Sequence, residues 1–151
     1  DAGDNIGLGF WTHQLQAATA WYPLEHQATA VTLGMTYEWH HDKKGTDIHP
    51  GSHFSLNWGI SQFLPLNKDQ TWLAELGVLG YDQWQITGDR GSDVSPFFAG
   101  AKDEVHAAGL EIGLVHTKSN VAFLVHYLRE FHARDRFEGE FFTATLVFGF
   151  P

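Results

Sequence analysis

Six residues with carboxylate or imidazole side chains lie inside stretches where apolar and polar residues alternate: Glu38, His40, Glu75, Glu111, His126 and Glu130. Such groups form ion pairs, bind cations or move protons, so these residues are the first candidates for a functional site. An alternation of period two predicts β-strands, because successive side chains of a strand point to opposite faces. The environment of the face that carries the six candidates therefore decides what they do.

The carboxylates predict which face of these strands is wet. If the apolar face contacts lipid, a charged side chain on it near the membrane midplane costs up to about 2–4 kcal/mol, and less for acids. We therefore expect the six candidates to face the lumen of a barrel, where Gly109 and Gly113 leave room around Glu111. They either line a pore or small-ligand cavity, or form networks that fill a narrow barrel, as is usual near eight strands. Both interpretations stay open here.

The segment 30–40 shows the alternation most clearly. Five large apolar residues share one of its faces: Val31, Leu33, Met35, Tyr37 and Trp39. An apolar face that ends in Tyr and Trp, backed by small and polar residues, is typical of a strand between lipid and a wet lumen. The alternative is a soluble sandwich or barrel, because alternation does not say which face is dry.

Aromatic residues recur near the ends of the predicted strands. From Trp72 to Trp84, about 3.3 Å per residue and a tilt of about 40° give a rise of about 30 Å, the thickness of a bilayer's hydrocarbon core. We expect two aromatic girdles, one at each interface. The girdle beside the short connections contains Trp21, Tyr22, Phe63 and Trp72. The girdle beside the long connections contains Phe10, Trp11, Tyr37, Trp39, Phe54, Tyr81 and Trp84.

The pattern predicts seven strands and no helix, at residues 6–22, 28–41, 53–64, 71–85, 105–116, 121–131 and 141–150. The connections between them alternate in length. Short ones at 23–27, 65–70 and 117–120 alternate with long ones at 42–51, 86–104 and 132–140. Short periplasmic turns and long outer loops are typical of a transmembrane β-barrel of the bacterial outer membrane. This orientation predicts that Asp1 lies outside and Pro151 lies on the periplasmic side.

The strand count predicts that this antiparallel barrel is incomplete. Single-chain bacterial barrels have an even number of strands, and seven strands that begin outside do not close one. Because open sheet edges are not tolerated in lipid, we expect the remaining strands to come from another segment, chain or copy. Residues 1–151 are then a single barrel domain or the C-terminal portion of a larger one. A break near His13 is the alternative, and it would give eight strands.

Composition excludes several classes of protein and site. The net charge of −9 argues against a nucleic-acid partner, and the chain has no apolar run long enough for a membrane-spanning helix. The absence of cysteine excludes a thiolate metal site or nucleophile. His40 and His41 point to opposite faces, whereas His49 and His53 could approach each other at a loop base. With no zinc-protease, phosphate-loop or dinucleotide signature in the sequence, we expect no metal, no cofactor and no enzyme activity.

Short motifs along the whole chain resemble the second half of the MetA-pathway phenol-degradation family. The segments that carry the resemblance are Asn5-Ile6-Gly7 with Phe10-Trp11, Gln14-Leu15-Gln16, Ala20-Trp21-Tyr22-Pro23, Thr36-Tyr37-Glu38, Leu56-Asn57-Trp58-Gly59, Gly80-Tyr81 with Gln83, and Tyr127 through Arg136-Phe137-Glu138-Gly139. The resemblance implies an outer-membrane barrel that admits hydrophobic compounds and has further strands before this region. It offers no catalytic motif.

These observations together predict an outer-membrane channel or uptake barrel for small hydrophobic or aromatic molecules. Its partners are the lipid bilayer, the solute and the remaining barrel strands. The loops at 42–51 and 86–104 would gate its outer mouth. The competing classes are a structural or assembly barrel with a filled lumen, and a soluble β-barrel that binds a small ligand.

Overall fold

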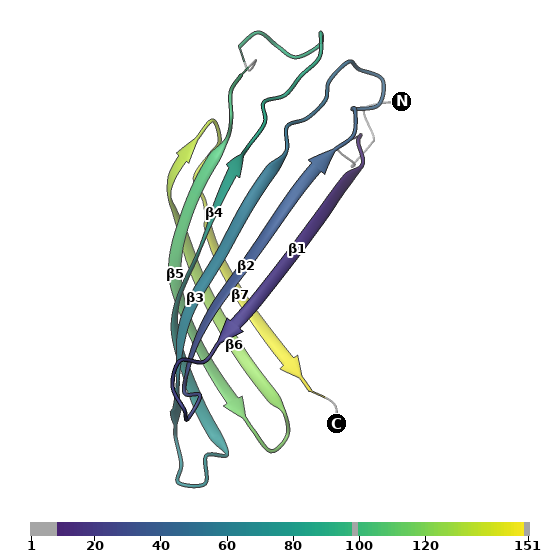
Figure 1. The fold of residues 1–151 in the computed structure, drawn as a ribbon. Helices are drawn as coiled ribbons and strands as arrows, with labels where there is room; N and C mark the ends of the chain where they lie inside the picture. The colour runs from purple at the N-terminus through teal and green to yellow at the C-terminus, as the bar shows by residue number, and fades with distance from the viewer. Residues whose placement is uncertain (1–8, 98–99, 150–151) are drawn as a thin grey trace.

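The regular elements of the chain are seven β-strands that form one antiparallel sheet, in the order β1 to β7 (Figure 1). The computed structural model describes residues 9–97 and 100–149. The strands are β1 (Thr12–Trp21), β2 (Thr29–His40), β3 (His53–Pro65), β4 (Trp72–Gln85), β5 (Glu104–His116), β6 (Val121–Arg134) and β7 (Glu140–Phe148). Among these residues the structure holds no helix long and apolar enough to span a membrane.

The predicted all-β fold and its seven strands are confirmed, with differences at the ends. β1 begins at Thr12 and runs unbroken through His13, so a break there does not produce an eighth strand. The predicted start of the first strand at residue 6 lies outside the described residues, as do Asp1, Pro151 and Phe150 at the predicted end of the last strand. β6 continues to Arg134, three residues beyond its predicted end.

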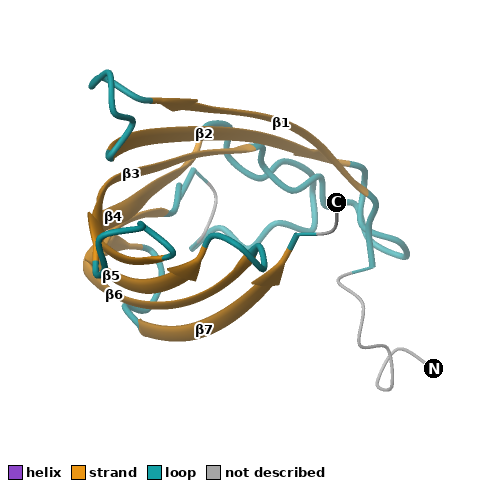
Figure 2. Cartoon of the chain, turned by 90° about the horizontal axis from the view of Figure 1, so that it is seen from below, coloured by secondary structure: helices purple, strands orange, loops and turns teal. Residues whose placement is uncertain are grey.

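The sheet curls into a half-barrel, which Figure 2 shows along its length. Its curvature is also evident from a contact across three strand spacings. The rings of Tyr81 on β4 and Phe141 on β7 lie 6.3 Å apart, whereas a flat sheet with strands about 4.8 Å apart would separate these strands by about 14 Å. The face that carries Tyr81 and Phe141 is therefore the concave face, and the opposite one is the convex face.

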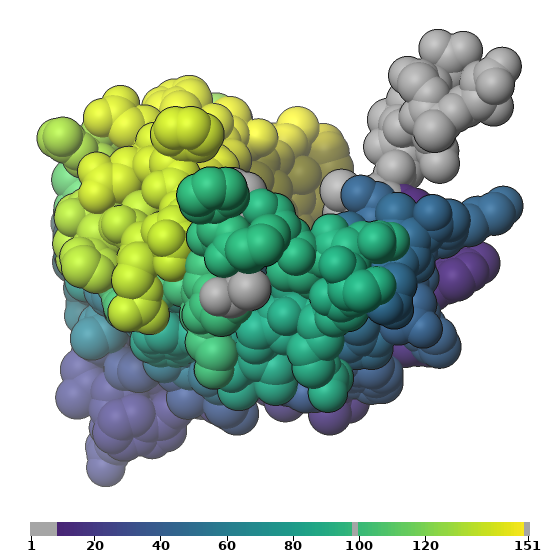
Figure 3. All heavy atoms as spheres, turned by 90° about the horizontal axis from the view of Figure 1, so that it is seen from above, coloured from purple at the N-terminus to yellow at the C-terminus, as the bar shows by residue number. Residues whose placement is uncertain are grey.

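The short and long connections lie at opposite ends of the half-barrel, as the sequence predicted (Figure 1). β1 starts and β7 ends at different ends, because the number of strands is odd. The view onto the long-loop end shows the atoms of the 86–103 loop, in teal and green, beside those of the 41–52 loop, in blue (Figure 3). We call this the loop end and the other the turn end.

The 41–52 and 86–103 loops are joined by hydrogen bonds. The Asp47 carboxylate accepts from the backbone N–H and the hydroxyl of Ser92, at 2.8 and 2.7 Å. His49 and Arg90 exchange two backbone hydrogen bonds, at 2.7 and 3.0 Å. The backbone N–H of Asp47 also donates to Asp93 at 2.7 Å. These contacts make the two loops a single bonded unit above the mouth of the half-barrel.

The convex face is apolar along the middle of the strands. Large side chains there stay exposed in this chain, and they include Leu33, Met35, Ile60, Leu76, Val78, Leu110, Ile112, Leu114, Phe123, Phe142 and Leu146. Strand register places them on one face, since Leu33 pairs with Trp58 and Val78 pairs with Leu110. The sequence left the face of β6 undecided. Its register with β5 puts Phe123 on the convex face and Leu124 on the concave one.

Candidate functional site

The concave face carries small and polar side chains, and we treat it as the candidate functional site. One register row illustrates its character, since Ala30, Ser61, Gly77, Glu111 and His126 are successive partners across five strands. Most of the buried positions among the described residues lie on this face or near the loop end, with Glu130 only 3% exposed. The alternation that makes one face apolar thus leaves the other face free for polar groups.

Four residues near the middle of the strands form a polar cluster, which we call the central cluster: Ser61, Glu75, Glu111 and His126. The Ser61 hydroxyl donates to Glu75 Oε1 at 2.8 Å. His126 Nε2 contacts Glu111 Oε2 at 2.6 Å, and the Glu75 and Glu111 carboxyl groups are direct neighbours. The cluster thus crosses four strands and pairs its two acids with a hydroxyl and an imidazole.

Glycines make room for the central cluster. A Cβ at Gly77 would lie 3.0 Å from Ser61 Cβ and 3.1 Å from Glu111 Oε1. A Cβ at Gly113 would lie 3.0 Å from Glu75 Cβ. The two acids occupy space that any larger residue at these positions would take.

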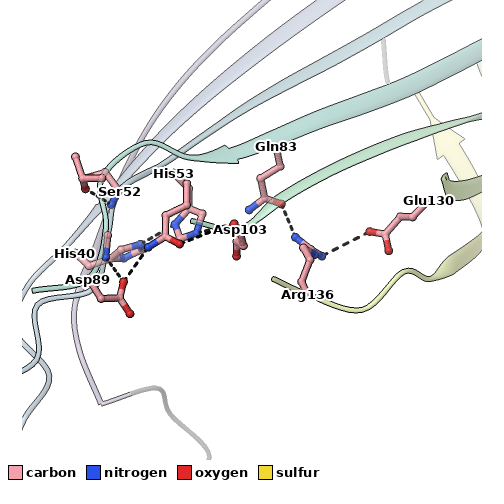
Figure 4. Close-up of polar contacts among 11 residues, drawn as sticks. His40, Ser52, His53, Gln83, Asp89, Asp103, Glu130 and Arg136 are labelled. Carbon is pink, nitrogen blue, oxygen red and sulfur yellow. Dashed lines mark hydrogen bonds and ion pairs between the residues drawn. The ribbon is translucent and has the colours of Figure 1, made fainter. Parts of the chain in front are cut away.

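A second cluster lies nearer the loop end and brings a loop residue onto the concave face. The Tyr81 hydroxyl donates to Glu130 Oε1 at 2.5 Å. Arg136, in the connection after β6, contacts the same carboxylate at 3.5 Å and donates to Gln83 at 3.2 Å. Figure 4 shows Arg136 between Gln83 and Glu130. The buried Glu130 carboxylate is thus matched by a hydroxyl and a guanidinium, as a buried charge requires.

A third cluster lines the loop end of the concave face. His40 Nδ1 contacts the Thr12 hydroxyl at 2.9 Å, and its Nε2 lies 3.5 Å from His53 Nδ1. His53 Nε2 in turn lies 3.4 Å from Asp103 Oδ1. Figure 4 shows this chain of side chains close to Asp89. Imidazoles and carboxylates therefore surround the mouth below the bonded loops.

A trough of about 700 Å³ opens on the concave face beside the central cluster. Small residues of β1 to β3 form one wall, among them Ala18, Ala20, Ala30, Gly34 and Gly59. Glu75, Glu111, His126, Tyr81 and the apolar side chains of Phe63, Leu79 and Leu128 border it as well. The volume suits a small organic molecule, and its lining offers both apolar contact and hydrogen bonds.

The six predicted site residues all lie on the concave face, but they do not form one site. Glu75, Glu111 and His126 come together in the central cluster. Glu130 belongs to the second cluster, with Tyr81, and His40 belongs to the third cluster, at the loop end. Glu38 is the register partner of His53, beside the third cluster, and its carboxylate accepts from Gln14 of β1 at 2.6 Å. Among the described residues His49 contacts Asp42 at 2.7 Å, and no hydrogen bond joins it to His53.

Sequence reasoning gave no cluster role to Ser61, Tyr81, Arg136 or Asp103, and it considered His53 only beside His49. It also misplaced the aromatic residues Tyr81 and Phe63. Tyr81 and Phe63 were expected in the girdles, but both lie on the concave face. The strand period could have predicted this for Tyr81. It is at an odd position of β4, whereas Trp72 and Trp84 are at even positions and point to the other face. Arg136 reaches Glu130 from a loop, so no strand pattern predicts its contact.

The other predicted girdle tryptophans and tyrosine within strands lie on the convex face. Trp21 and Trp72 are at the turn end, and Tyr37, Trp39 and Trp84 are near the loop end. Trp11 directly precedes β1 and is 81% exposed. The rings of Tyr37 and Trp39 stack with 5.8 Å between centroids, and Trp84 stacks on Phe54 at 6.1 Å. Aromatic residues thus flank the apolar band of the convex face at both ends.

A family model described as "Putative MetA-pathway of phenol degradation" matches residues 1–146 of the chain. The chain belongs to this family. The match covers β1 to β6 and continues into β7 as far as Leu146. The resemblance inferred from the short motifs is confirmed. No curated protein and no solved structure matches the chain.

Proposed function

We propose that the protein is an outer-membrane β-barrel through which small hydrophobic or aromatic molecules cross by passive diffusion. The observation that carries the proposal is the contrast between the two faces of one sheet. The convex face is apolar and bounded by aromatic residues, whereas the concave face holds polar clusters and a trough of about 700 Å³. Lipid on one side and a wet lumen on the other account for both faces.

The convex face supports the lipid bilayer as a partner. Leu110 and Ile112 on β5 are 58% and 59% exposed, and Ile60 on β3 is 51% exposed. Monomeric soluble proteins rarely expose a contiguous apolar surface of this kind. A soluble sandwich would need a second sheet against this face. In a bilayer the same side chains replace water with acyl chains and stabilise the barrel.

The edges of the half-barrel support the presence of further strands. Every residue of β1 and of β7 is exposed, and each strand pairs on one side only within the described residues. Unpaired backbone N–H and C=O groups are costly in lipid, so the complete barrel needs partners at both edges. We propose that these strands come from another segment, chain or copy.

The trough supports passage of a small aromatic or hydrophobic solute. Its apolar members Phe63, Leu79 and Leu128 offer contact to a ring, while Tyr81 and the central cluster hydrogen-bond a hydroxyl. The Ala and Gly residues of β1 to β3 leave the other wall of the trough free of large side chains. Diffusion along such a path needs no catalytic residue and no cofactor. The membership of a family named for phenol degradation agrees with a phenolic solute.

Osmotic swelling of liposomes tests the proposal. The full-length protein is reconstituted, and swelling is followed in phenyl glucoside and in glucose, which differ by one aromatic ring and both cross bare lipid slowly. We expect faster swelling in phenyl glucoside than in glucose, and no swelling without protein. If folded protein gives no swelling in either solute, the lumen is filled and the channel proposal is wrong. If the protein stays in buffer without detergent, the membrane proposal is wrong.

A further inference from the structure

A cluster on the convex face at the loop end has the composition and geometry of a metal site. Glu104 and His106 come from β5, and His132 comes from β6. One carboxylate oxygen and two imidazole nitrogens of these residues all lie within 4.8 Å of one another. Glu104 Oε1 is 3.1 Å from His106 Nε2 and 3.7 Å from His132 Nε2. We propose that Glu104, His106 and His132 bind a divalent transition-metal ion, such as Zn²⁺.

The donor set suits such an ion. Imidazole nitrogen and carboxylate oxygen are ordinary ligands of Zn²⁺, and three protein ligands leave a fourth position for water or another group. In a tetrahedral site with ligand bonds of about 2.1 Å, ligand atoms lie about 3.4 Å apart. The separations around Glu104 Oε1, 3.1 and 3.7 Å, bracket this value. The third separation, between the two imidazole nitrogens, is within 4.8 Å, so the donors close onto one ion once these two rings approach each other.

A β-bulge places His132 in this cluster. His106 pairs with His132, whereas the next residue of β5, Ala107, pairs with Glu130. Phe131 is thus an extra residue on β6. Without it, the register continued from Ala107–Glu130 would put Phe131 opposite His106. Bulges commonly re-aim a side chain, and this one puts a second imidazole beside His106.

Neighbouring groups orient two of the three donors. Asp82 Oδ1 accepts a hydrogen bond from His106 Nδ1 at 2.6 Å, which leaves the lone pair of Nε2 facing the cluster. The other oxygen of Asp82 accepts from the Trp58 indole at 3.0 Å. Arg134 donates to Glu104 Oε2 at 2.6 Å, which leaves Oε1 for the ion. A carboxylate behind a metal-binding histidine is a frequent arrangement in metal sites.

The charges around the cluster also suit a cation. Glu104 and Asp82 supply two negative charges, and Arg134 supplies one positive charge, so neutral imidazoles leave a net charge of about −1 by this count. The two carboxylates would neutralise a divalent ion at the centre, and with Arg134 the loaded cluster would carry a net charge of about +1. Without an ion, three nitrogen-bearing side chains share the single Glu104 carboxylate.

Zinc titration of the full-length protein in detergent tests the proposal. After treatment with a chelator, binding of Zn²⁺ is measured by competition with a chromophoric chelator, and Co²⁺ is added separately to record its visible d–d bands. We expect one strong Zn²⁺ site per chain and Co²⁺ bands typical of four-coordination. His132→Gln and His106→Gln should each weaken Zn²⁺ binding by about tenfold or more. Asp82→Asn should weaken it by about 10–100-fold without removing a ligand.

His26→Gln is the matched control, because His26 is an exposed histidine in the connection between β1 and β2, at the opposite end of the sheet. It should bind Zn²⁺ as the unmodified protein does. Circular dichroism and heat-dependent gel migration establish that each variant folds. If the folded His132→Gln and His106→Gln proteins keep full affinity, or if the unmodified protein binds no Zn²⁺, the proposal is wrong. The proposal is also wrong if Zn²⁺ affinity depends instead on His13 and His41, whose Nε2 atoms lie 2.9 Å apart.

Discussion

Tyr81 and Glu130 lie on β4 and β6, with β5 between them, yet the Tyr81 hydroxyl donates to Glu130 Oε1 at 2.5 Å. In a flat sheet these strands would be about 10 Å apart. The hydrogen bond therefore crosses β5 and links β4 directly to β6 on the concave face. It also pairs the Glu130 carboxylate, which is 3% exposed.

Tyr81→Phe should destabilise the folded protein by about 1–3 kcal/mol, because it leaves a buried carboxylate short of one donor. The measurement is the urea midpoint of unfolding from lipid vesicles, followed by tryptophan fluorescence. Tyr127→Phe is the control, since Tyr127 is on the convex face and 41% exposed. Equal midpoints for the two variants would mean that the Tyr81 hydroxyl contributes nothing to the stability of the folded protein.

Alternation predicted most of the fold because it depends on local sequence. The residues at odd positions from 31 to 39 all have large apolar side chains. The strand period alone therefore identifies the convex face of β2. β6 was undecided because both of its faces are apolar between Ala122 and Leu128. Its assignment comes from pairing with β5, which is a long-range property. Tyr81 was misplaced because it was assigned by its aromatic character and not by its odd position along β4, which puts it on the concave face.

The clusters could be predicted only in part, for the same physical reason. The strand acids were identifiable because a charge inside an alternating segment is unusual. Arg136, the partner of Glu130, and the pair His53 and Asp103 lie in loops or at strand ends. There, the curvature of the sheet and the path of the loop decide which side chains come into contact. Beyond the bulge at Phe131, the residues of β6 point to the opposite face from the one that a regular strand would give them. No local pattern in the sequence marks this bulge, so the His106–His132 pair was not foreseen.

Two strand glycines should respond differently to the same substitution. A Cβ at Gly109 would lie 1.8 Å from the Tyr127 carbonyl oxygen, so Gly109→Ala forces β5 and β6 apart. A Cβ at Gly34 would lie 3.7 Å from Asn57 Cβ, an ordinary contact. We expect Gly109→Ala to cost about 1–3 kcal/mol or more, and Gly34→Ala to have little effect. Urea midpoints check this, and an unchanged midpoint for Gly109→Ala would contradict it.

The contact between Asp47 and Ser92 should persist well into the acidic range. Hydrogen bonds from the Ser92 backbone N–H and hydroxyl lower the pKa of the Asp47 carboxyl. Its contribution to loop order is therefore fully present above the unfolded pKa of about 3.9 and is lost as pH falls through the lower folded value. Hydrogen exchange at the Ser92 amide, corrected for intrinsic rate, should show protection at pH 5 and 7 alike.

Asp47→Ala should remove that protection at every pH, because the acceptor is gone. Asp42→Ala is the control, since Asp42 lies in the same loop but contacts His49 within it. If Asp47→Ala leaves the Ser92 amide as protected as Asp42→Ala does, the carboxylate does not join the two loops.

Ala17 and Ala18 offer a matched pair for the solute path. They are neighbours on β1 and face opposite sides of the sheet, and Ala18 lines the trough. Ala18→Phe should slow swelling in phenyl glucoside several-fold by filling the trough, whereas Ala17→Phe adds the same ring to the convex face and should leave swelling unchanged. Equal rates for both folded variants would show that solute does not pass along this wall.

Leu110 and Leu66 distinguish lipid from water as the medium of the convex face. Both side chains are 58% exposed, but Leu110 lies in the middle of β5 and Leu66 lies in the turn after β3. On a water-exposed surface, lysine at either position would have a similarly small effect. In a bilayer, Leu110→Lys places a charge near the midplane and costs about 2–4 kcal/mol, whereas Leu66→Lys stays at the interface and costs about 0–1 kcal/mol.

The measurement is the free energy of folding into vesicles from urea, taken for both variants and the unmodified protein. A much larger loss for Leu110→Lys than for Leu66→Lys is the expected result. Similar small losses for both would mean that water, or another part of the protein, covers the convex face. Because the two leucines are equally exposed in this chain, a difference between them reports the surrounding medium rather than packing within the half-barrel.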